Sequence, residues 1–326
     1  MQHARRDMTS LLDLRQVTHF YGNVCALRDV DLQIEPGAIG LVGQNGAGKS
    51  TMMQILLGLI RPTRGSATVL GHDVRRAGIR LRGRVGFMPE RDAVVRGLSG
   101  IEYVALAGEL CGMPRRQALR RAHETLSYLG MEEARYRRLE QYSAGMVQRL
   151  KLAATLIHDP DLLLLDEPTA GLDPDGRAAM LALLGRLAVR PGKSLVLSSH
   201  LLGDIERVCT SAIILNEGRV VSVGRLEELR AESQRCYRLR WDGDATGFLA
   251  ALRQQGVDIH VDDRGDQARA MVPADWNTRA FFAHARQHAI LLTGLEPEEE
   301  DLEAVYHRLI NSSDASHYAA PRSLAK

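Results

Sequence analysis

No apolar stretch in this sequence approaches the roughly 18 residues that a membrane-spanning helix needs. The chain begins with Arg5 and Arg6, but an aspartate follows and no adequate apolar core comes after them, which argues against a signal peptide. The sequence also contains no internal repeat. We therefore expect a chain that does not cross a membrane itself, and we treat residues 1–10 as a leader.

Cysteine pairs and a strong net charge are absent as well. The four cysteines, Cys25, Cys111, Cys209 and Cys236, are widely spaced and form no C-x-x-C pair. This spacing argues against a disulfide framework or a zinc site and favours a reduced cytoplasm. The net charge of +2 implies neither nucleic acid nor an anionic membrane as a partner. With 326 residues, 45% hydrophobic, the chain suits one large or two ordinary globular domains.

Lysine is scarce, because arginine supplies most of the positive charge. Lys49 nevertheless stands in the pattern G-x-x-x-x-G-K-[ST], which residues 43–51 (GQNGAGKST) match. Glycines let backbone N–H groups turn toward phosphate oxygens without a Cβ clash. Lys49 would contact the β- and γ-phosphates, and the Ser50 hydroxyl would bind Mg²⁺. The candidate ATP-binding residues of this loop are Gly43, Gln44, Asn45, Gly46, Ala47, Gly48, Lys49, Ser50 and Thr51. A glycine-rich surface turn is the alternative.

The surroundings of this loop predict a strand before it and a helix after it. Residues 40–42 are a short apolar run typical of a buried strand, and residues 51–59 have helical apolar spacing. A helix that starts there would direct its positive end at the phosphates.

Further strands and helices alternate up to about residue 225. Short apolar or alternating runs predict strands within 11–42, at 66–70, 85–90, 162–166, 195–199 and 212–215. Residues 98–160 are helical in pattern, with a Ser99–Glu102 capping box, an arginine-rich helix over 115–130 and a helix over 144–157 capped by Ser143. This order predicts an α/β protein with a parallel sheet, helices on both of its faces and an inserted helical subdomain at about 92–160.

The pattern changes near residue 225. Residues 226–312 predict a strand at 237–241, a helix at 247–255, strands near 257–261 and 268–272, a helix at 277–288, a strand at 289–293 and a closing helix at 300–310. This β-α-β-β-α-β order is that of a ferredoxin-like module. Its expected core residues are Leu239, Trp241, Phe248, Leu249, Leu252, Phe281, Phe282, Leu302, Val305 and Leu309. We expect the tail, residues 313–326, to be disordered.

Two carboxylates end the apolar run at 162–166. Asp166 and Glu167 follow a strand that would be buried on both faces, and the carboxyl ends of parallel strands are where open α/β sheets bind ligands. Asp166 would hold Mg²⁺ directly or through water. Glu167 would orient and deprotonate an attacking water. An ordinary acidic strand end is the alternative.

These motifs, in this order, resemble the ATP-binding subunit of an ABC transporter over about residues 11–224. The resemblance implies a P-loop ATPase core with an antiparallel β subdomain. It makes residues 43–51 the Walker A loop, 162–167 Walker B with its general base, 142–146 (YSAGM) the signature motif and 170–173 (AGLD) the D-loop. The resemblance also implies roles for single residues. Tyr21, Ser143, Gly145 and Asp173 would contact the nucleotide, Glu90 would sense Mg²⁺, and His200 would contact the γ-phosphate. A structural tyrosine, a solvated Glu90 and an ordinary histidine after a strand are the alternatives.

Departures from the family pattern indicate the subgroup. Ala144 and Met146 replace the commoner glycine and glutamine of the signature, and Glu90 replaces a glutamine. By resemblance, these variants are typical of exporter-type (ABC-2-like) subunits with a C-terminal extension. The resemblance further implies a head-to-tail homodimer that encloses two ATP molecules and drives separate transmembrane permease subunits at the cytoplasmic face of the membrane.

Two other functions remain open at this point. One is a non-transport ABC ATPase acting on nucleic acid or the ribosome, although the second cassette, long coiled coil or zinc insertion that such chains usually carry is missing. The other is a regulatory module that binds ATP without turnover, against which Glu167 and His200 argue. We expect no direct binding of nucleic acid.

Overall fold

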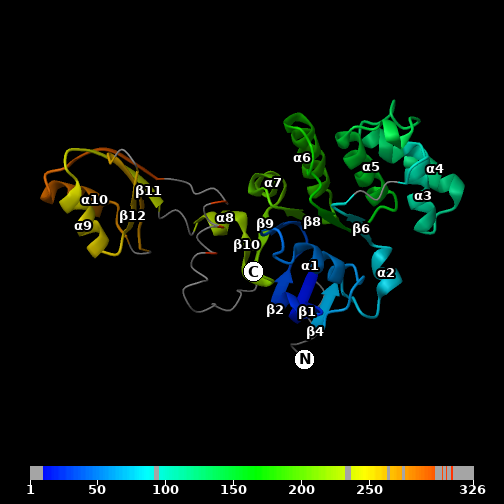
Figure 1. The fold of residues 1–326 in the computed structure, drawn as a ribbon, viewed down its shortest axis with the longest axis horizontal. Coiled ribbons are helices and arrows are strands. Elements are labelled where there is room, and N and C mark those ends of the chain that lie inside the picture. The colour runs from blue at the N-terminus through cyan, green and yellow to red at the C-terminus, as the bar shows by residue number, and fades with distance from the viewer. Residues whose placement is uncertain are drawn as a thin grey trace. The chain divides into compact units, whose positions relative to one another are not determined.

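The computed structural model describes residues 10–91, 95–231, 236–262, 265–273 and 276–297, together with Glu303, Tyr306 and Ile310. Apart from Ser10, the predicted leader and tail lie outside this part of the chain. The chain folds into two compact units, of which the first extends to Leu226 and the second begins at Glu227 (Figure 1). Each unit has its own hydrophobic core.

The first unit begins with an antiparallel sheet. Its strands are β1 (Leu12–Tyr21), β2 (Val24–Ile34), β4 (Arg64–Val69) and β5 (His72–Asp73), in the order β2-β1-β4-β5. Gly22 has a φ of 57° in the turn between β1 and β2, a conformation that glycine adopts without strain. The register pairs Leu12 with Ile34 and Leu14 with Leu32, so this face of the hairpin is apolar and buried.

A six-stranded sheet forms the centre of the first unit. Its strands are β3 (Ala38–Val42), β6 (Val85–Met88), β7 (Leu162–Asp166), β8 (Ser194–Ser199), β9 (Ser211–Asn216) and β10 (Arg219–Arg225). Their order is β10-β9-β3-β8-β7-β6, and every neighbouring pair is parallel except β9 with β10. All residues of β3, β7 and β8 are buried, which explains why these strands are continuously apolar rather than alternating.

Helices lie on both sides of this sheet. They are α1 (Lys49–Leu56), α2 (Gly78–Arg82), α6 (Pro174–Ala188) and α7 (Leu202–Val208), and α8 (Leu226–Ala231) lies at the division between the units. Figure 1 shows α6 and α7 on one side of the six-stranded sheet and α1 on the other. The predicted parallel α/β core is therefore confirmed.

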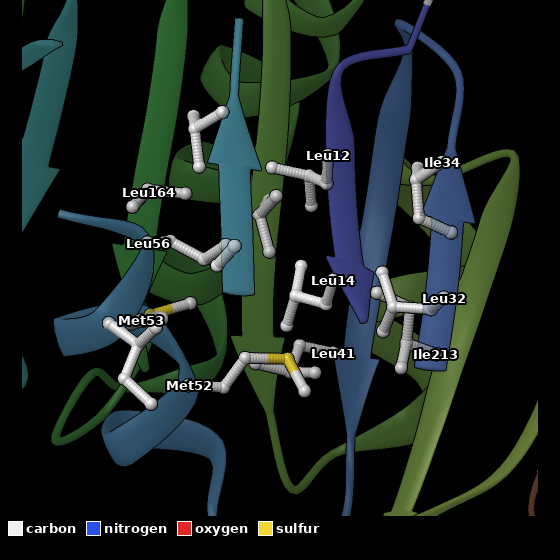
Figure 2. Packing of buried hydrophobic residues seen from close by; sticks show 14 of the residues in the cluster. Leu12, Leu14, Leu32, Ile34, Leu41, Met52, Met53, Leu56, Leu164 and Ile213 are labelled. Atoms are coloured by element: carbon white, nitrogen blue, oxygen red, sulfur yellow. The ribbon is translucent and has the colours of Figure 1, made fainter. Parts of the chain in front are cut away.

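The main core lies between the two sheets and α1. Figure 2 shows Leu12 and Leu14 of β1 directed toward the side of the six-stranded sheet that carries Leu41 and Leu164, with Met53 of α1 filling the adjacent space. These side chains are at most 1% exposed. Full burial of one such side chain is worth about 1.5–3 kcal/mol. This packing fixes α1, and therefore the loop before it, against the sheet.

A helical subdomain is inserted between β6 and β7. It contains α3 (Gly100–Leu110), α4 (Arg115–Tyr128), the 3₁₀ turn η2 (Leu139–Gln141) and α5 (Ala144–Leu156), and the three α-helices pack on one another. The predicted capping box is confirmed, because the backbone N–H and hydroxyl of Ser99 donate to Glu102 Oε2 at 2.8 and 2.7 Å. These hydrogen bonds lower the pKa of Glu102.

The second unit is a four-stranded antiparallel sheet with two helices. Its elements are β11 (Cys236–Asp242), α9 (Thr246–Gln254), β12 (Asp258–Val261), β13 (Gln267–Met271), α10 (Arg279–Gln287) and β14 (Leu291–Pro297). The strand order β12-β13-β11-β14 and the chain order β-α-β-β-α-β confirm the predicted ferredoxin-like arrangement. The predicted core residues Leu239, Trp241, Phe248, Leu252 and Phe281 are buried, and Leu249 packs against them.

Several predictions of detail were wrong. Phe282 is 55% exposed, because Phe281 and Ala285 occupy the buried face of α10. The first helix spans 49–56 rather than 51–59, and the last described strand spans 291–297 rather than 289–293. The predicted core residues Leu302, Val305 and Leu309, and most of the predicted closing helix, lie outside the described residues. Within the described chain, no helix is long and apolar enough to cross a bilayer.

Candidate functional site

The loop that joins β3 to α1 requires glycine at defined positions. A Cβ on Gly43 would lie 2.7 Å from the Leu215 carbonyl oxygen and 2.9 Å from Ala47 Cβ. Gly48 has a φ of 104°, and a Cβ there would lie 2.7 Å from the Ala26 carbonyl oxygen. The predicted glycine pattern therefore corresponds to close backbone approach at Gly43 and to a left-handed turn at Gly48.

Lys49 is the first residue of α1, and its ammonium group folds back onto the loop. Nζ donates to the carbonyl oxygens of Gly43 at 2.7 Å and Gln44 at 3.2 Å, and it lies 3.9 Å from Glu167 Oε1. Only 7% of the residue is exposed. The cation is thus held where the loop N–H groups and the N-terminus of α1 favour an anion.

Ser50 and Asp166 are brought together across the end of the sheet. The Ser50 hydroxyl donates to Asp166 Oδ2 at 2.9 Å, and the Ser198 hydroxyl donates to Asp166 Oδ1 at 2.8 Å. Among the described residues, no group of three or more His, Cys, Asp or Glu side chains is arranged to hold a metal. One hydroxyl and one carboxylate nevertheless fit Mg²⁺, which usually binds one or two carboxylates and completes its shell with water and substrate phosphates.

Glu167 follows β7 in a left-handed backbone conformation with a φ of 48°. Its Oε2 lies 2.8 Å from His200 Nδ1, in an orientation that forms a hydrogen bond when Nδ1 carries a proton. Its Oε1 is buried and accepts no hydrogen bond from the described residues. Burial raises the pKa of Glu167, and the interactions with His200 and Lys49 offset only part of this effect. A carboxylate oxygen without a hydrogen-bond donor can accept a proton from a water molecule that reaches it.

Tyr21 lies beside the helix that follows the loop. Its hydroxyl donates to Gln54 Oε1 in α1 at 3.1 Å, and its ring meets His19 edge to face at 4.7 Å between centroids. Nearly half of the side chain is exposed. The ring is therefore available for stacking, and its role in binding adenine stays a prediction.

Glu90 lies two residues beyond β6 and is exposed. Its backbone carbonyl accepts a hydrogen bond from Lys151 Nζ of α5 at 3.0 Å. No described contact joins its carboxylate to Ser50 or Asp166. The structure therefore connects Glu90 to the helical subdomain, and its predicted role as a Mg²⁺ ligand stays a prediction.

The signature and D-loop residues begin helices. Ser143 is the predicted N-cap of α5, and its Oγ accepts from the Met146 N–H at 3.3 Å. Gly145 lies beside Leu172, where an added Cβ would be 3.9 Å from Leu172 Cδ2. Asp173 caps α6 by accepting from the Gly176 N–H at 2.9 Å, which gives it a structural role whether or not nucleotide binds. No described contact joins Ser143, Gly145 or Asp173 to Lys49, and their nucleotide roles stay predictions.

Sequence reasoning missed the side chains that support the site. Ser198 holds Asp166, Gln54 holds Tyr21, and Asp204 accepts from Thr169 and Arg177. The serines at the end of β8 could have been noticed, because they lie beside the end of β7 in a parallel sheet. The pairing of Arg177 with Asp204 joins residues far apart in the sequence and has no local signal.

Comparison with known proteins gives consistent matches. The family model described as "ABC transporter" matches residues 27–170. An uncharacterized ABC transporter ATP-binding protein, YxlF, of Bacillus subtilis (strain 168) is 31% identical over 93% of this chain and 100% of its own length. A Nod factor export ATP-binding protein I of Cupriavidus pinatubonensis (strain JMP 134 / LMG 1197) is 32% identical over 88% of this chain and 84% of its own. A solved dimeric ATP-binding cassette in a post-hydrolysis state, bound to ADP and Pi, matches with a TM-score of 0.61 and 27% identity over 66% of this chain and 98% of that one.

Proposed function

Since this chain belongs to the ABC transporter family as an ATP-binding, ATP-hydrolysing subunit, we propose that it powers an exporter by ATP-dependent dimerisation and by coupling to separate transmembrane subunits. The observation that carries the proposal is the set of side chains at the carboxyl edge of the sheet. Lys49, Glu167 and His200 form one chain of contacts there, and Ser50 with Asp166 forms a second.

Export is supported by the relatives and by the extent of their likeness. One relative is named as a Nod factor export protein, and its match extends over 88% of this chain. The match with YxlF spans 93%, which is more than the first unit alone. The second unit is thus part of what is shared with such subunits, in line with an exporter-type chain that carries a C-terminal domain.

The loop residues 43–51 would bind the ATP phosphates. Backbone N–H groups at the glycine positions and at the start of α1 supply donors, and Lys49 supplies the charge next to the β- and γ-phosphates. The Lys49 ammonium group donates to two loop carbonyl oxygens. Phosphate oxygens would replace these neutral acceptors with charged ones, to which hydrogen bonds are stronger.

Ser50 and Asp166 would hold Mg²⁺, with Glu90 as a further candidate. The bound ion would neutralise charge that develops on the phosphate oxygens. The Ser50–Asp166 hydrogen bond already places a hydroxyl oxygen and a carboxylate oxygen 2.9 Å apart. Ser198 fixes the other oxygen of Asp166, so the carboxylate keeps one orientation.

Glu167 would be the general base for hydrolysis. Burial raises its pKa, which makes it a better proton acceptor than an ordinary glutamate. His200 lies against Oε2, which leaves Oε1 to accept the proton of an attacking water. His200 is half exposed, so its ring can also reach a γ-phosphate.

Dimerisation would complete each site. The exposed N-terminus of α5, which Ser143 begins, is suited to an anion, and the chain has a separate phosphate loop of its own. The signature residues would therefore bind the ATP of a second copy. The solved cassette that resembles this chain is also dimeric. The subunit would join the membrane through its permease partners.

Co-purification tests this proposal. The affinity-tagged full chain, carrying Glu167→Gln to retain ATP, is isolated with ATP from detergent-solubilised cells, and the bound proteins are identified. We expect a polytopic membrane protein in defined stoichiometry, and its loss when Lys49→Ala is added. Recovery of ribosomes or nucleic acid instead, with no membrane protein, would contradict transport and favour the non-transport ATPase.

A further inference from the structure

A buried carboxylate on α7 joins three elements beside the catalytic glutamate. Asp204 is 1% exposed. Its Oδ2 accepts from the Thr169 hydroxyl at 2.6 Å, and its Oδ1 accepts from Arg177 Nε at 2.7 Å and forms an ion pair with Arg177 Nη2 at 2.6 Å. Thr169 belongs to the loop that follows β7, Arg177 is on α6, and Asp204 lies four residues after His200. The network therefore connects the helix after His200 with the loop that follows β7, through Thr169, and with α6, through Arg177.

This segment, residues 167–173, is also fixed at other points; we call it the 167–173 loop. The Glu167 N–H donates to the Ser198 carbonyl at 3.1 Å, and the Ala170 N–H donates to the Glu167 carbonyl at 3.1 Å. The Ala170 carbonyl accepts from Gln148 Nε2 of α5 at 3.2 Å. The hydrogen bond from Thr169 to Asp204 connects the loop to α7. Asp204 therefore fixes the part of the loop that lies next to α7.

The first residue of this loop needs such support. Glu167 has a φ of 48°, a conformation that residues with a side chain rarely adopt and that persists where the surrounding structure fixes it. Its distance of 2.8 Å to His200 Nδ1 depends on the relative positions of the 167–173 loop and the start of α7. Asp204 is part of α7 and binds the loop through Thr169.

We propose that Asp204 is a positioning residue, which together with Arg177 keeps the 167–173 loop in register with α7 so that Glu167 and His200 stay aligned for hydrolysis. The inference rests on the proposed role of Glu167. Asp204 itself touches neither Glu167 nor His200 in the described contacts. Its effect would act through Thr169 and Arg177.

The alternative is that the ion pair only stabilises the fold. Removal of the Asp204 charge leaves Arg177 unpaired, and removal of Arg177 leaves the buried Asp204 charge unpaired. Either change lowers the stability of the fold, whether or not Asp204 has a role in catalysis. The double change Asp204→Asn with Arg177→Met removes both charges and keeps similar shapes, and the asparagine carbonyl oxygen still accepts from Thr169. Arg186→Met is the matched control, because Arg186 is an exposed arginine on the same helix, α6.

The test compares binding with turnover for Asp204→Asn, Arg177→Met, the double variant and Arg186→Met. Each purified full-length protein is titrated with ATP in EDTA to obtain the affinity and the number of competent sites. Phosphate release with Mg²⁺-ATP then gives kcat per competent site. A thermal melt records stability separately, and Arg177→Lys tests whether a cation at this position restores turnover.

We expect Asp204→Asn and Arg177→Met each to lower kcat per site by about tenfold or more, since a misplaced catalytic group can lower the rate up to about a hundredfold. ATP affinity should stay within about twofold, because the phosphate loop is untouched, and the double variant should be no slower than the slower single variant. Arg177→Lys should recover part of the rate, and Arg186→Met should match the parent.

A kcat per site within about twofold of the parent in both single variants, with only the melting temperature lowered, would overturn the proposal and leave a stabilising ion pair. The parent and Glu167→Gln are assayed alongside. If the parent turns over and Glu167→Gln does not, normal turnover by Asp204→Asn refutes only this inference. A parent without turnover refutes the proposed function and this inference with it.

Discussion

Replacement of Glu167 by glutamine removes the proposed base and keeps its shape. The side chain is 8% exposed, so an isosteric amide fills the same space. Loss of a general base typically lowers the rate by a factor of about 10²–10⁴. This factor corresponds to about 2.7–5.4 kcal/mol in the barrier. Turnover should therefore nearly stop.

Binding of ATP should not weaken in the same variant. Glu167 Oε1 lies 3.9 Å from Lys49 Nζ, next to the expected position of the phosphates. The substitution removes a negative charge that would repel them, so we expect equal or tighter ATP binding. An ATP-dependent dimer should accumulate, because bound ATP is no longer consumed.

Three assays check these expectations. Single-turnover phosphate release measures the chemical step, ATP titration in EDTA measures binding, and size exclusion with ATP detects the dimer. Glu109→Gln is the control, because Glu109 is an exposed glutamate on α3. A hydrolysis rate within about tenfold of the parent, well below the loss expected of a missing base, would refute the assignment of Glu167.

Three further predictions concern pH, Glu90 and the second unit. Burial raises the pKa of Glu167, and a general base acts in its deprotonated form. On acidification, kcat should therefore start to fall at a pH above the ordinary glutamate pKa of about 4.3. A pH–rate profile whose acid limb lies at or below this pKa would contradict the prediction. Glu90→Gln should keep the rate of Mg²⁺-dependent hydrolysis within about tenfold of the parent, a change of roughly 1.4 kcal/mol in the barrier. Glu90→Ala should still bind ATP, but its hydrolysis should be uncoupled from transport in reconstituted vesicles. If Glu90→Ala matches the parent in both ATP hydrolysis and transport, Glu90 does not couple the two. Truncation after residue 225 should preserve ATP binding and weaken dimerisation or transport, and unchanged assembly and transport would make the second unit dispensable.

The elements that sequence reasoning located best are those with a strong local signal. The apolar run of β7 is buried on both faces, and the Ser99–Glu102 capping box lies where α3 begins. The start of α1 was placed two residues late, because apolar spacing begins at Thr51 whereas the helix begins at Lys49, whose polar side chain turns back into the loop. The helix α6 was not predicted, although Asp173 followed by Pro174 is an N-cap signal.

The contacts between elements were the least predictable part. A carboxylate after β7 and a hydroxyl after the phosphate loop could be expected near one sheet edge, and the structure brings Asp166 and Ser50 together. Phe281 and Phe282 are equally apolar, and only the packing of α10 decides which of them is buried. The ion pair of Arg177 with Asp204 depends on how α6 and α7 pack, which spacing along one chain does not encode.

Phosphate release by the purified protein and by its Lys49→Ala variant shows whether this chain hydrolyses ATP at the site around Lys49. Lys49→Ala keeps the backbone loop and removes the cation that would contact the β- and γ-phosphates. We predict Mg²⁺-dependent release by the parent and a rate lower by about two orders of magnitude in the variant. Equal release by the two proteins at matched purity would show that ATP is not hydrolysed at this site.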